Sequence, residues 1–228
     1  GANLGALKVP DGLKEKDLNL ALALKVAARL SDLDVILTRE SDIYLSLAER
    51  VNLSGLEEVD LFLSLHANAG GGRGFESFIS NTAGGRDAAA LMQKALHGEI
   101  MEALGRWEIV DRGLKRAPFY VLRHNPRPAV LIESLFIDHE REANLWREPL
   151  FVDMLASGVA RGVRAAVGVD GEQEADGGGP GAGVTILPGT TLYTVQVGAF
   201  AYLDNARRRL SEAQAAGFDD AYIYQKQF

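Results

Sequence analysis

The sequence contains no cysteine among its 228 residues. Disulfides, thiolate metal sites and thiol nucleophiles are therefore all excluded. Any metal site in this chain must instead be built from histidine and carboxylate side chains. The absence of cysteine suits both the cytosol and the cell envelope, so it does not decide between these two compartments.

The chain also lacks an excess of positive charge and any long apolar run. Lys and Arg number 24 against 31 Asp and Glu, which gives a net charge of −7 and an isoelectric point near 5.2. Nucleic acid is not expected as the main partner, because no basic excess exists to neutralise phosphates. No apolar run approaches the roughly 20 residues that span a bilayer, so we expect no membrane span.

A signal peptide is not visible in the sequence either. The chain begins at Gly1 without a methionine, and it ends at Phe228 inside a segment that reads as a strand. We therefore expect both ends to have been cut from a longer protein, in which case the missing signal says little about location.

Strand and helix patterns alternate over the first three quarters of the chain. This alternation predicts an α/β domain, with a twisted, mostly parallel sheet and helices on both faces. In the helix expected at 86–104, Leu91, Ala95 and Ile100 are assigned to the inner face. Strands are expected at residues 32–38, 61–68, 75–80, 119–122 and 129–133, and helices at 14–30, 46–56, 86–104, 140–146 and 150–167.

The composition changes after residue 168. An acidic, glycine-rich stretch predicts a flexible linker at 169–190. Beyond the linker, Tyr193, Val195 and Val197 alternate with polar residues, and a helical pattern follows. We therefore divide the chain into a main domain at 1–168, the linker, and a partial βαβ module at 191–228.

His66 ends a run of apolar and small residues that reads as a strand buried on both faces. A glycine cluster, Gly70 to Gly72, follows and opens the chain into a loop. The imidazole is thus expected at the carboxyl edge of a sheet, where α/β proteins bind ligands. A histidine that merely finds a hydrogen-bond partner at a strand end fits the same pattern.

Glu133 lies inside the apolar run Ala129 to Ile137. A carboxylate in such a run is costly unless it is paired, protonated or close to a metal ion. Its pKa is expected to be raised, which would suit a general base. The alternative is a strand-end glutamate that reaches solvent or pairs with an arginine such as Arg123.

Glu15 begins a helix whose inner face is apolar. The helix dipole favours an acidic residue in this position, which is sufficient to explain Glu15 on its own. Together with His66 it offers one carboxylate oxygen and one imidazole nitrogen. A catalytic zinc site usually takes three protein ligands, so one ligand would still be missing. The other histidines are less promising: we expect His97 to face solvent, His139 to lie on the surface and His124 to lie at a loop edge.

Seven blocks of the sequence, in this order, resemble the zinc-dependent N-acetylmuramoyl-L-alanine amidases of bacterial cell walls (family 3 type). The tail from Tyr193 to Gly217 resembles the start of a SPOR domain, a small peptidoglycan-binding module. The seven blocks are Gly12 to Leu20, Leu37 to Arg39, Leu47 to Arg50, Ser64 to Asn68, Asp111 to Lys115, Phe119 to Arg123 and Pro128 to Glu133.

The resemblance implies that Glu15 and His66 bind Zn²⁺ and that Glu133 is the catalytic glutamate. It implies a third ligand, a histidine of a Gly-His-Gly-Gly segment just before Gly1. With two ligands of three, the chain as given is expected to bind zinc weakly and to be inactive. Asn68 would support the site from beside His66 or serve only the turn. The short segment from Asn81 to Leu104 leaves little room for an inhibitory helical insertion, so an open cleft is expected.

The resemblance further implies hydrolysis of the amide bond between the muramic acid lactyl group and L-alanine of the stem peptide. Peptidoglycan is then the partner, the protein is extracytoplasmic, in the periplasm or cell envelope, and a protein activator is possible. A monomer is expected. Two alternatives remain: a catalytically inactive cell-wall-binding protein, and a zinc carboxypeptidase acting on stem peptides.

Overall fold

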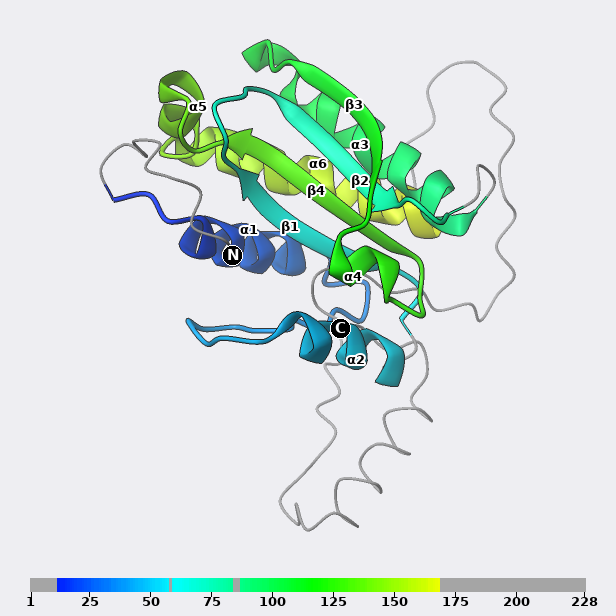
Figure 1. Cartoon of the computed structure of the whole chain (residues 1–228). Helices are drawn as coiled ribbons and strands as arrows, with labels where there is room; N and C mark the ends of the chain where they lie inside the picture. The colour runs from blue at the N-terminus through cyan, green and yellow to red at the C-terminus, as the bar shows by residue number, and fades with distance from the viewer. Residues whose placement is uncertain (1–11, 58, 84–86, 169–228) are drawn as a thin grey trace.

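The computed structural model describes residues 12–57, 59–83 and 87–168 (Figure 1). The linker expected at 169–190 and the partial module expected at 191–228 lie outside these residues. Among the described helices, none combines the length and the apolar character that a membrane crossing requires.

The described strands form one sheet in the order β1-β4-β2-β3 (Figure 1). β1 with β4 and β2 with β3 are parallel, whereas β2 and β4 are antiparallel, so the expected mostly parallel sheet is confirmed. The strands are β1 (Phe62–Asn68), β2 (Phe75–Ser80), β3 (Asp111–Ala117) and β4 (Ala129–Phe136), and the helices are α1 (Glu15–Arg29), α2 (Leu47–Leu56), α3 (Ala88–Leu104), the 3-10 turn η1 (Gly105–Trp107), α4 (Tyr120–Arg123), α5 (Glu140–Leu145) and α6 (Pro149–Val167).

Local signals explain where several helices begin and end. Ser46 caps α2 through a capping box with Glu49, in which each side chain accepts a hydrogen bond from the other residue's backbone N–H. Asp87 caps α3 by accepting a hydrogen bond from the backbone N–H of Ala89 at 2.9 Å. α6 begins at Pro149 and ends at Val167, and the following Gly168 caps it in the left-handed conformation that glycine tolerates best.

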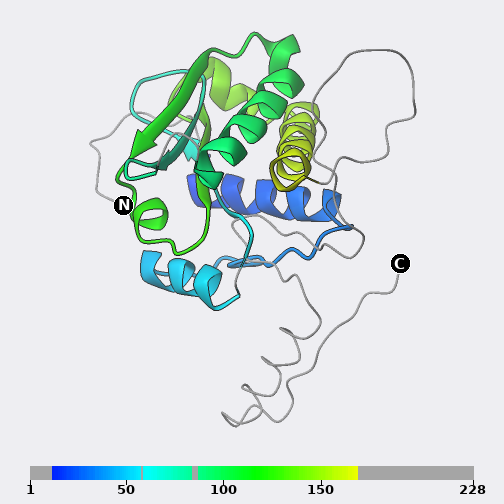
Figure 2. The same ribbon diagram turned by 90° about the vertical axis from the view of Figure 1, so that its right-hand side faces the viewer.

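Helices cover both faces of the sheet, as the sequence predicts. α1, α3 and α6 lie together on one face, where they bury the larger apolar core (Figure 2). α4 and α2 lie over the other face, above a smaller core that includes Phe62, Val121 and Leu131. Because hydrophobic burial is the main favourable term in folding, the larger core accounts for most of the stabilisation.

Close packing of α6 on α3 depends on two glycines. A Cβ atom at Gly158 would lie 2.7 Å from Ala103 Cβ, and one at Gly162 would lie 2.8 Å from Leu96 Cα. Both separations are shorter than a carbon–carbon contact allows. The two helices could not keep their present separation with larger residues at these positions.

Side-chain alternation in β1 and β4 determines which residues reach the face of α4. The two strands bury aliphatic side chains on the α1, α3 and α6 face, and the intervening residues point to the opposite face. That face therefore receives His66 from β1 and Glu133 from β4. The strand expected at 129–133 continues to Phe136, so Glu133 lies within β4 rather than at its end. The aliphatic side chains are Leu63, Leu65, Val130 and Ile132.

The strand expected at 32–38 is a wrong prediction. Asp34 forms an isolated bridge, and the rest of the segment is irregular. Val35, Ile36 and Leu37 nevertheless pack against the larger core. A strand needs a neighbour with which to form a hydrogen-bonded ladder, and this segment has no continuous one among the described residues.

The strand expected at 119–122 is also wrong, because this segment is the helical turn α4. The backbone N–H groups of Leu122 and Arg123 donate to Phe119 O at 3.0 and 2.9 Å. Four apolar residues fit a strand or a helical turn equally well, and only their neighbours decide. The strand in this region is β3, which sequence reasoning missed because glycine and alternating charges mask it; charged side chains are common on an edge strand.

The inner face expected for helix α3 is confirmed only in part. Ile100 is fully buried, as expected, but Leu91 is 63% exposed and Ala95 is partly exposed, while the fully buried Leu96 was not expected there. His97, expected to face solvent, is only 6% exposed. Its two ring nitrogens lie 2.9 Å from Ser77 Oγ and 2.9 Å from Asp111 Oδ1, and these two partners make its burial tolerable.

Candidate active site

Helix α1 and strand β1 bring Glu15 and His66 into direct contact. His66 Nδ1 lies 2.8 Å from Glu15 Oε1, and its other ring nitrogen, Nε2, lies 3.1 Å from Ser64 Oγ. The Asn19 amide, one turn further along α1, donates to Glu15 Oε1 at 3.2 Å. Both side chains are thereby held in defined orientations at the carboxyl end of β1.

The contact with His66 changes the acidity of Glu15. Burial alone would raise the pKa of this carboxyl group. The hydrogen bond and charge of His66, with the hydrogen bond from Asn19, outweigh burial and lower the pKa. Glu15 is therefore ionised at neutral pH, as a cation ligand must be.

Glu133 stands next to this pair, because it is the direct register partner of His66 in the parallel β1–β4 pairing. Its Oε2 atom is buried and has no hydrogen-bond partner among the described residues. Burial raises the pKa of Glu133 to about 7; the charge of His66 opposes this rise, and those of Glu15 and Glu76 add to it. A carboxyl group with this pKa can both accept and release a proton near neutral pH. No ion pair joins it to Arg123 in the described part of the chain.

Glu76 is a fourth member of the site that sequence reasoning missed. It lies on β2 directly opposite Glu133 in the antiparallel pairing and is only 4% exposed. Asn68 Nδ2 donates to its Oε1 at 2.8 Å, and Arg112 Nε lies 3.0 Å from its Oε2. Lys115 also pairs with Oε2. The sequence does contain a signal for Glu76: it is a carboxylate inside the strand Phe75–Ser80, just as Glu133 is a carboxylate inside β4.

The partners of Glu76 keep it ionised. Burial would raise its pKa, but the hydrogen bonds and charges of Lys115 and Arg112 lower it overall. Two neighbouring glutamates thus have opposite tendencies: the pKa of Glu76 is lowered and that of Glu133 is raised. Such a separation is typical of sites where one carboxyl group transfers protons and the other supports the structure.

Two of the described residues offer atoms of the types that bind zinc. Glu15 Oε1 and His66 Nδ1 are a carboxylate oxygen and an imidazole nitrogen, the ligand types that zinc accepts, and they already lie within 2.8 Å of each other. The orphaned Oε2 of Glu133 shows that the same region holds an unsatisfied buried polar atom. No cluster of three or more His, Asp or Glu suited to a metal occurs among residues 12–57, 59–83 and 87–168. By chemistry, Glu15 and His66 therefore fit two of the three protein ligands that a catalytic zinc site usually takes.

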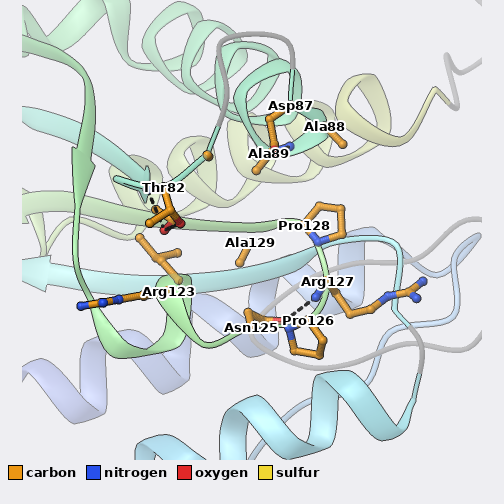
Figure 3. Close-up of a pocket in the computed structure, with 13 residues that line it drawn as sticks. Thr82, Asp87, Ala88, Ala89, Arg123, Asn125, Pro126, Arg127, Pro128 and Ala129 are labelled. Atoms are coloured by element: carbon orange, nitrogen blue, oxygen red, sulfur yellow. Dashed lines mark hydrogen bonds between the residues drawn. The ribbon is translucent and has the colours of Figure 1, made fainter.

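A cavity of about 350 Å³ lies elsewhere in the molecule (Figure 3). It is bounded by the start of β4 at Ala129, the end of β2 at Ser80 and the start of α3 at Ala88. Arg123 and Asn125 line it as well. His66 and Glu133 lie further along β1 and β4, toward the other end of the sheet, so this cavity is not the candidate active site.

The remaining histidines stand apart from the site. His124 is exposed, and its ring lies 4.4 Å from that of Tyr120, centroid to centroid. His139 precedes α5 and is partly buried, where a surface position was expected. Asn68 was expected to support the site from beside His66 or to serve the turn. Its amide donates to Glu76 and its Oδ1 accepts the N–H of Ala69 at 2.8 Å, so the turn contact is present, while support of a metal site stays a prediction.

The sequence is similar to characterised families over nearly its whole length. Residues 1–165 match the family model described as N-acetylmuramoyl-L-alanine amidase, and residues 177–227 match that of the SPOR domain. The chain is 37% identical over 217 residues to the sporulation-specific N-acetylmuramoyl-L-alanine amidase of Bacillus subtilis, a match that covers 93% of this chain and 77% of that protein.

Solved structures give the same answer. The catalytic domain of CwlV, an N-acetylmuramoyl-L-alanine amidase from Bacillus (Paenibacillus) polymyxa, matches with a TM-score of 0.63 at 31% identity, covering 70% of this chain and 88% of that one. The CwlD amidase of Clostridioides difficile, solved in complex with the GerS lipoprotein, matches with a TM-score of 0.64 at 26% identity over 73% of this chain and 92% of that one. The fold class and the resemblance are thereby confirmed. The chain belongs to the N-acetylmuramoyl-L-alanine amidase family.

Proposed function

We propose that this protein is a zinc hydrolase that cleaves the amide bond between the lactyl group of N-acetylmuramic acid and the L-alanine of the peptidoglycan stem peptide. The observation that carries the proposal is the Glu15–His66 contact beside Glu133, whose buried Oε2 has no partner among the described residues. In this proposal Glu15 and His66 hold the metal, and a third ligand comes from outside the described residues.

In the proposed reaction the metal-holding residues and Glu133 have different tasks. Zinc would supply a Lewis acid that polarises the amide carbonyl and makes water a better nucleophile. Glu133 Oε2 takes a proton from the attacking water as oxygen bonds to the carbonyl carbon. The same oxygen then gives this proton to the nitrogen of L-alanine as the carbon–nitrogen bond breaks. The acid released is the lactyl carboxylate, and the peptide leaves with a free amine.

The surroundings of Glu133 suit this role. Burial and the neighbouring carboxylates bring its pKa to about 7, so it can be deprotonated when water attacks and protonated when the amine leaves. Ser64 and Asn19 act from the second layer, since they bind His66 and Glu15 and so orient the two metal-holding groups.

The proposal extends to the biological setting. We place the protein in the cell envelope, in the periplasm where the cell has one, acting as a monomer in cell-wall remodelling, sporulation or daughter-cell separation. The segment 177–227 would bind peptidoglycan, since it matches the SPOR family. A protein activator is included because the related CwlD amidase has been solved with a lipoprotein bound.

A second candidate function is a zinc carboxypeptidase acting on stem peptides. Arg112 and Lys115 favour it, because a carboxypeptidase needs a cation for the terminal carboxylate and both lie two strands away from Glu133. The two reactions give different products: an amidase releases the intact stem peptide, whereas a carboxypeptidase removes only the terminal residue.

The test uses the full-length protein, purified peptidoglycan and mass analysis of the soluble products. Wild type is expected to release intact stem peptides with a free L-alanine amine. Glu133→Gln should lower the rate by about 10²- to 10⁴-fold while the zinc content stays unchanged. Glu102→Gln, an exposed glutamate on α3, is the matched control and should retain full activity. Unchanged activity in Glu133→Gln, or terminal residues alone as products, would refute the proposal.

A further inference from the structure

The buried carboxylate of Glu76 is paired with two cationic side chains. Arg112 Nε lies 3.0 Å from its Oε2, and Lys115 pairs with the same oxygen. One cation would be sufficient to neutralise one carboxylate. The cluster of Glu76, Arg112 and Lys115 therefore carries a net charge of about +1, and its carboxylate lies opposite the proposed catalytic glutamate in the β2–β4 pairing.

The two cations remain accessible although their partner is not. The side chain of Glu76 is 6% exposed, whereas those of Arg112 and Lys115 are 32% and 37% exposed. Aromatic rings support both: the Arg112 guanidinium lies 5.0 Å from the centroid of Phe136, and Lys115 Nζ lies 5.8 Å from that of Phe78. The arrangement fixes the cations in place and leaves donors available to a ligand.

The register sets the separation between this cluster and the reacting centre. Glu133 pairs with His66 on one side and with Glu76 on the other, and β3 with its two cations follows β2. Neighbouring strands lie about 4.8 Å apart, so β3 is roughly 10 Å from β4. An extended peptide advances about 3.3–3.6 Å per residue, so this distance corresponds to about three residues.

We propose that Arg112 and Lys115 form a subsite for a carboxylate of the stem peptide, within three residues of the cleaved bond. The inference rests on the proposed amidase function. It adds that the stem peptide runs from Glu133 on β4 across β2 to the two cations on β3. The subsite makes the protein selective for stem peptides whose nearest acidic residue is free rather than amidated. Glu76 is a positioning residue, because both cations contact its buried Oε2 atom and are oriented by it.

The test compares two synthetic muropeptides that differ only in whether the acidic residue nearest the cleaved bond is free or amidated. With the zinc-loaded full-length protein, Lys115→Met should lower kcat/KM for the free-acid substrate by about ten- to a hundredfold, mainly through KM, the range expected for a charge-assisted hydrogen bond. For the amidated substrate the change should be less than about twofold. Lys115→Arg should restore selectivity, and Lys94→Met, an exposed lysine on α3, should behave as wild type.

Binding gives a second readout that does not depend on turnover. Calorimetry with Glu133→Gln protein should show tighter binding of the free-acid muropeptide, and adding Lys115→Met should abolish the preference. Equal losses on both substrates, or no loss on either, would overturn the subsite. If Lys115→Met fails to fold, Arg112→Gln carries the same comparison. A wild type that hydrolyses neither substrate refutes the amidase function, while a preserved binding preference still supports the subsite.

Discussion

His66 Nδ1 lies 2.8 Å from Glu15 Oε1, although 51 residues separate the two in the chain. The contact joins the first residue of α1 to the end of a buried strand, so it exists only when the helix is packed on the sheet. A carboxylate oxygen and an imidazole nitrogen held this close by separate elements are both donor types that a zinc ion accepts. The contact is therefore the centre of the predicted metal site.

Loss of either member of this contact should weaken zinc binding. In the full-length protein, His66→Ala and Glu15→Ala are each expected to lower zinc affinity well beyond the 10- to 100-fold change typical of an outer-layer residue. Asn19→Ala, which removes only a hydrogen bond to Glu15, should remain within that range. His124→Ala is the control, because this histidine is exposed and stacks on Tyr120 away from the site. Competition with a fluorescent chelator measures the zinc affinity of all four variants. If His66→Ala and Glu15→Ala bind zinc as tightly as the control, the proposed metal site is excluded.

Glycine at position 162 should be needed for stability. A Cβ atom there would lie 2.8 Å from Leu96 Cα, so Gly162→Ala should push α6 away from α3 and cost about 1–3 kcal/mol of unfolding free energy. Gly98, an exposed glycine in α3, has no atom within 4 Å of its ideal Cβ position. Gly98→Ala should therefore stabilise the protein by about 0.5–1 kcal/mol through helix propensity. Urea unfolding of the two variants should give opposite signs.

A site residue could be predicted from the sequence when the signal lies in its own segment, and not when its role depends on partners from distant segments. His66 and Glu133 were found because each ends or interrupts an apolar run in its own segment, whereas the role expected for Glu15 depended on the family resemblance. The structure brings all three together. Glu76 breaks its strand in the same way, yet its importance depends on cations 36 to 39 residues later in the chain, on an edge strand that the sequence analysis did not predict. Its partners could not be inferred without the sheet order.

The wrong predictions share a physical cause. Segments 32–38 and 119–122 are short and apolar, and such a run is compatible with strand, turn or helix until its neighbours are known. His97 was expected to face solvent because the sequence places it on a helix and shows none of the partners it has in the fold. Its partners, Ser77 and Asp111, come from β2 and β3, so burial became favourable only in the assembled fold.

Replacing Glu76 should lower the free energy of unfolding strongly, because one side chain is the partner of three others. Glu76→Ala leaves Arg112 and Lys115 without their shared partner and Asn68 without its acceptor. Breaking such a buried ion cluster by deleting one member typically costs about 3–5 kcal/mol; partial exposure of the two cations places this case at about 2–3 kcal/mol. Glu76→Gln keeps the hydrogen bond from Asn68 possible and should cost less. Unfolding in guanidinium that shows no difference from wild type would contradict the cluster's structural importance.

The pKa of Glu133 predicts a specific pH dependence of stability in the metal-free protein. Its value in the folded state is about 7, above the ordinary 4.5, so between these two pH values the folded state binds more protons than the unfolded state. The stability contribution of the neutral carboxyl group is thus fully present below pH 4.5 and is lost as the pH rises through 7. At pH 8 the buried charge should cost about 3 kcal/mol.

Glu133→Gln isolates this effect, because the amide remains neutral at every pH. The variant should be about as stable as wild type near pH 4.5 and more stable by up to about 3 kcal/mol at pH 8. Urea unfolding of both metal-free proteins across this range gives the difference directly. Glu102→Gln, exposed on α3, should show no such trend. A constant difference between Glu133→Gln and wild type would mean that Glu133 is ionised throughout, and its proposed exchange of a proton near neutral pH would then have no basis.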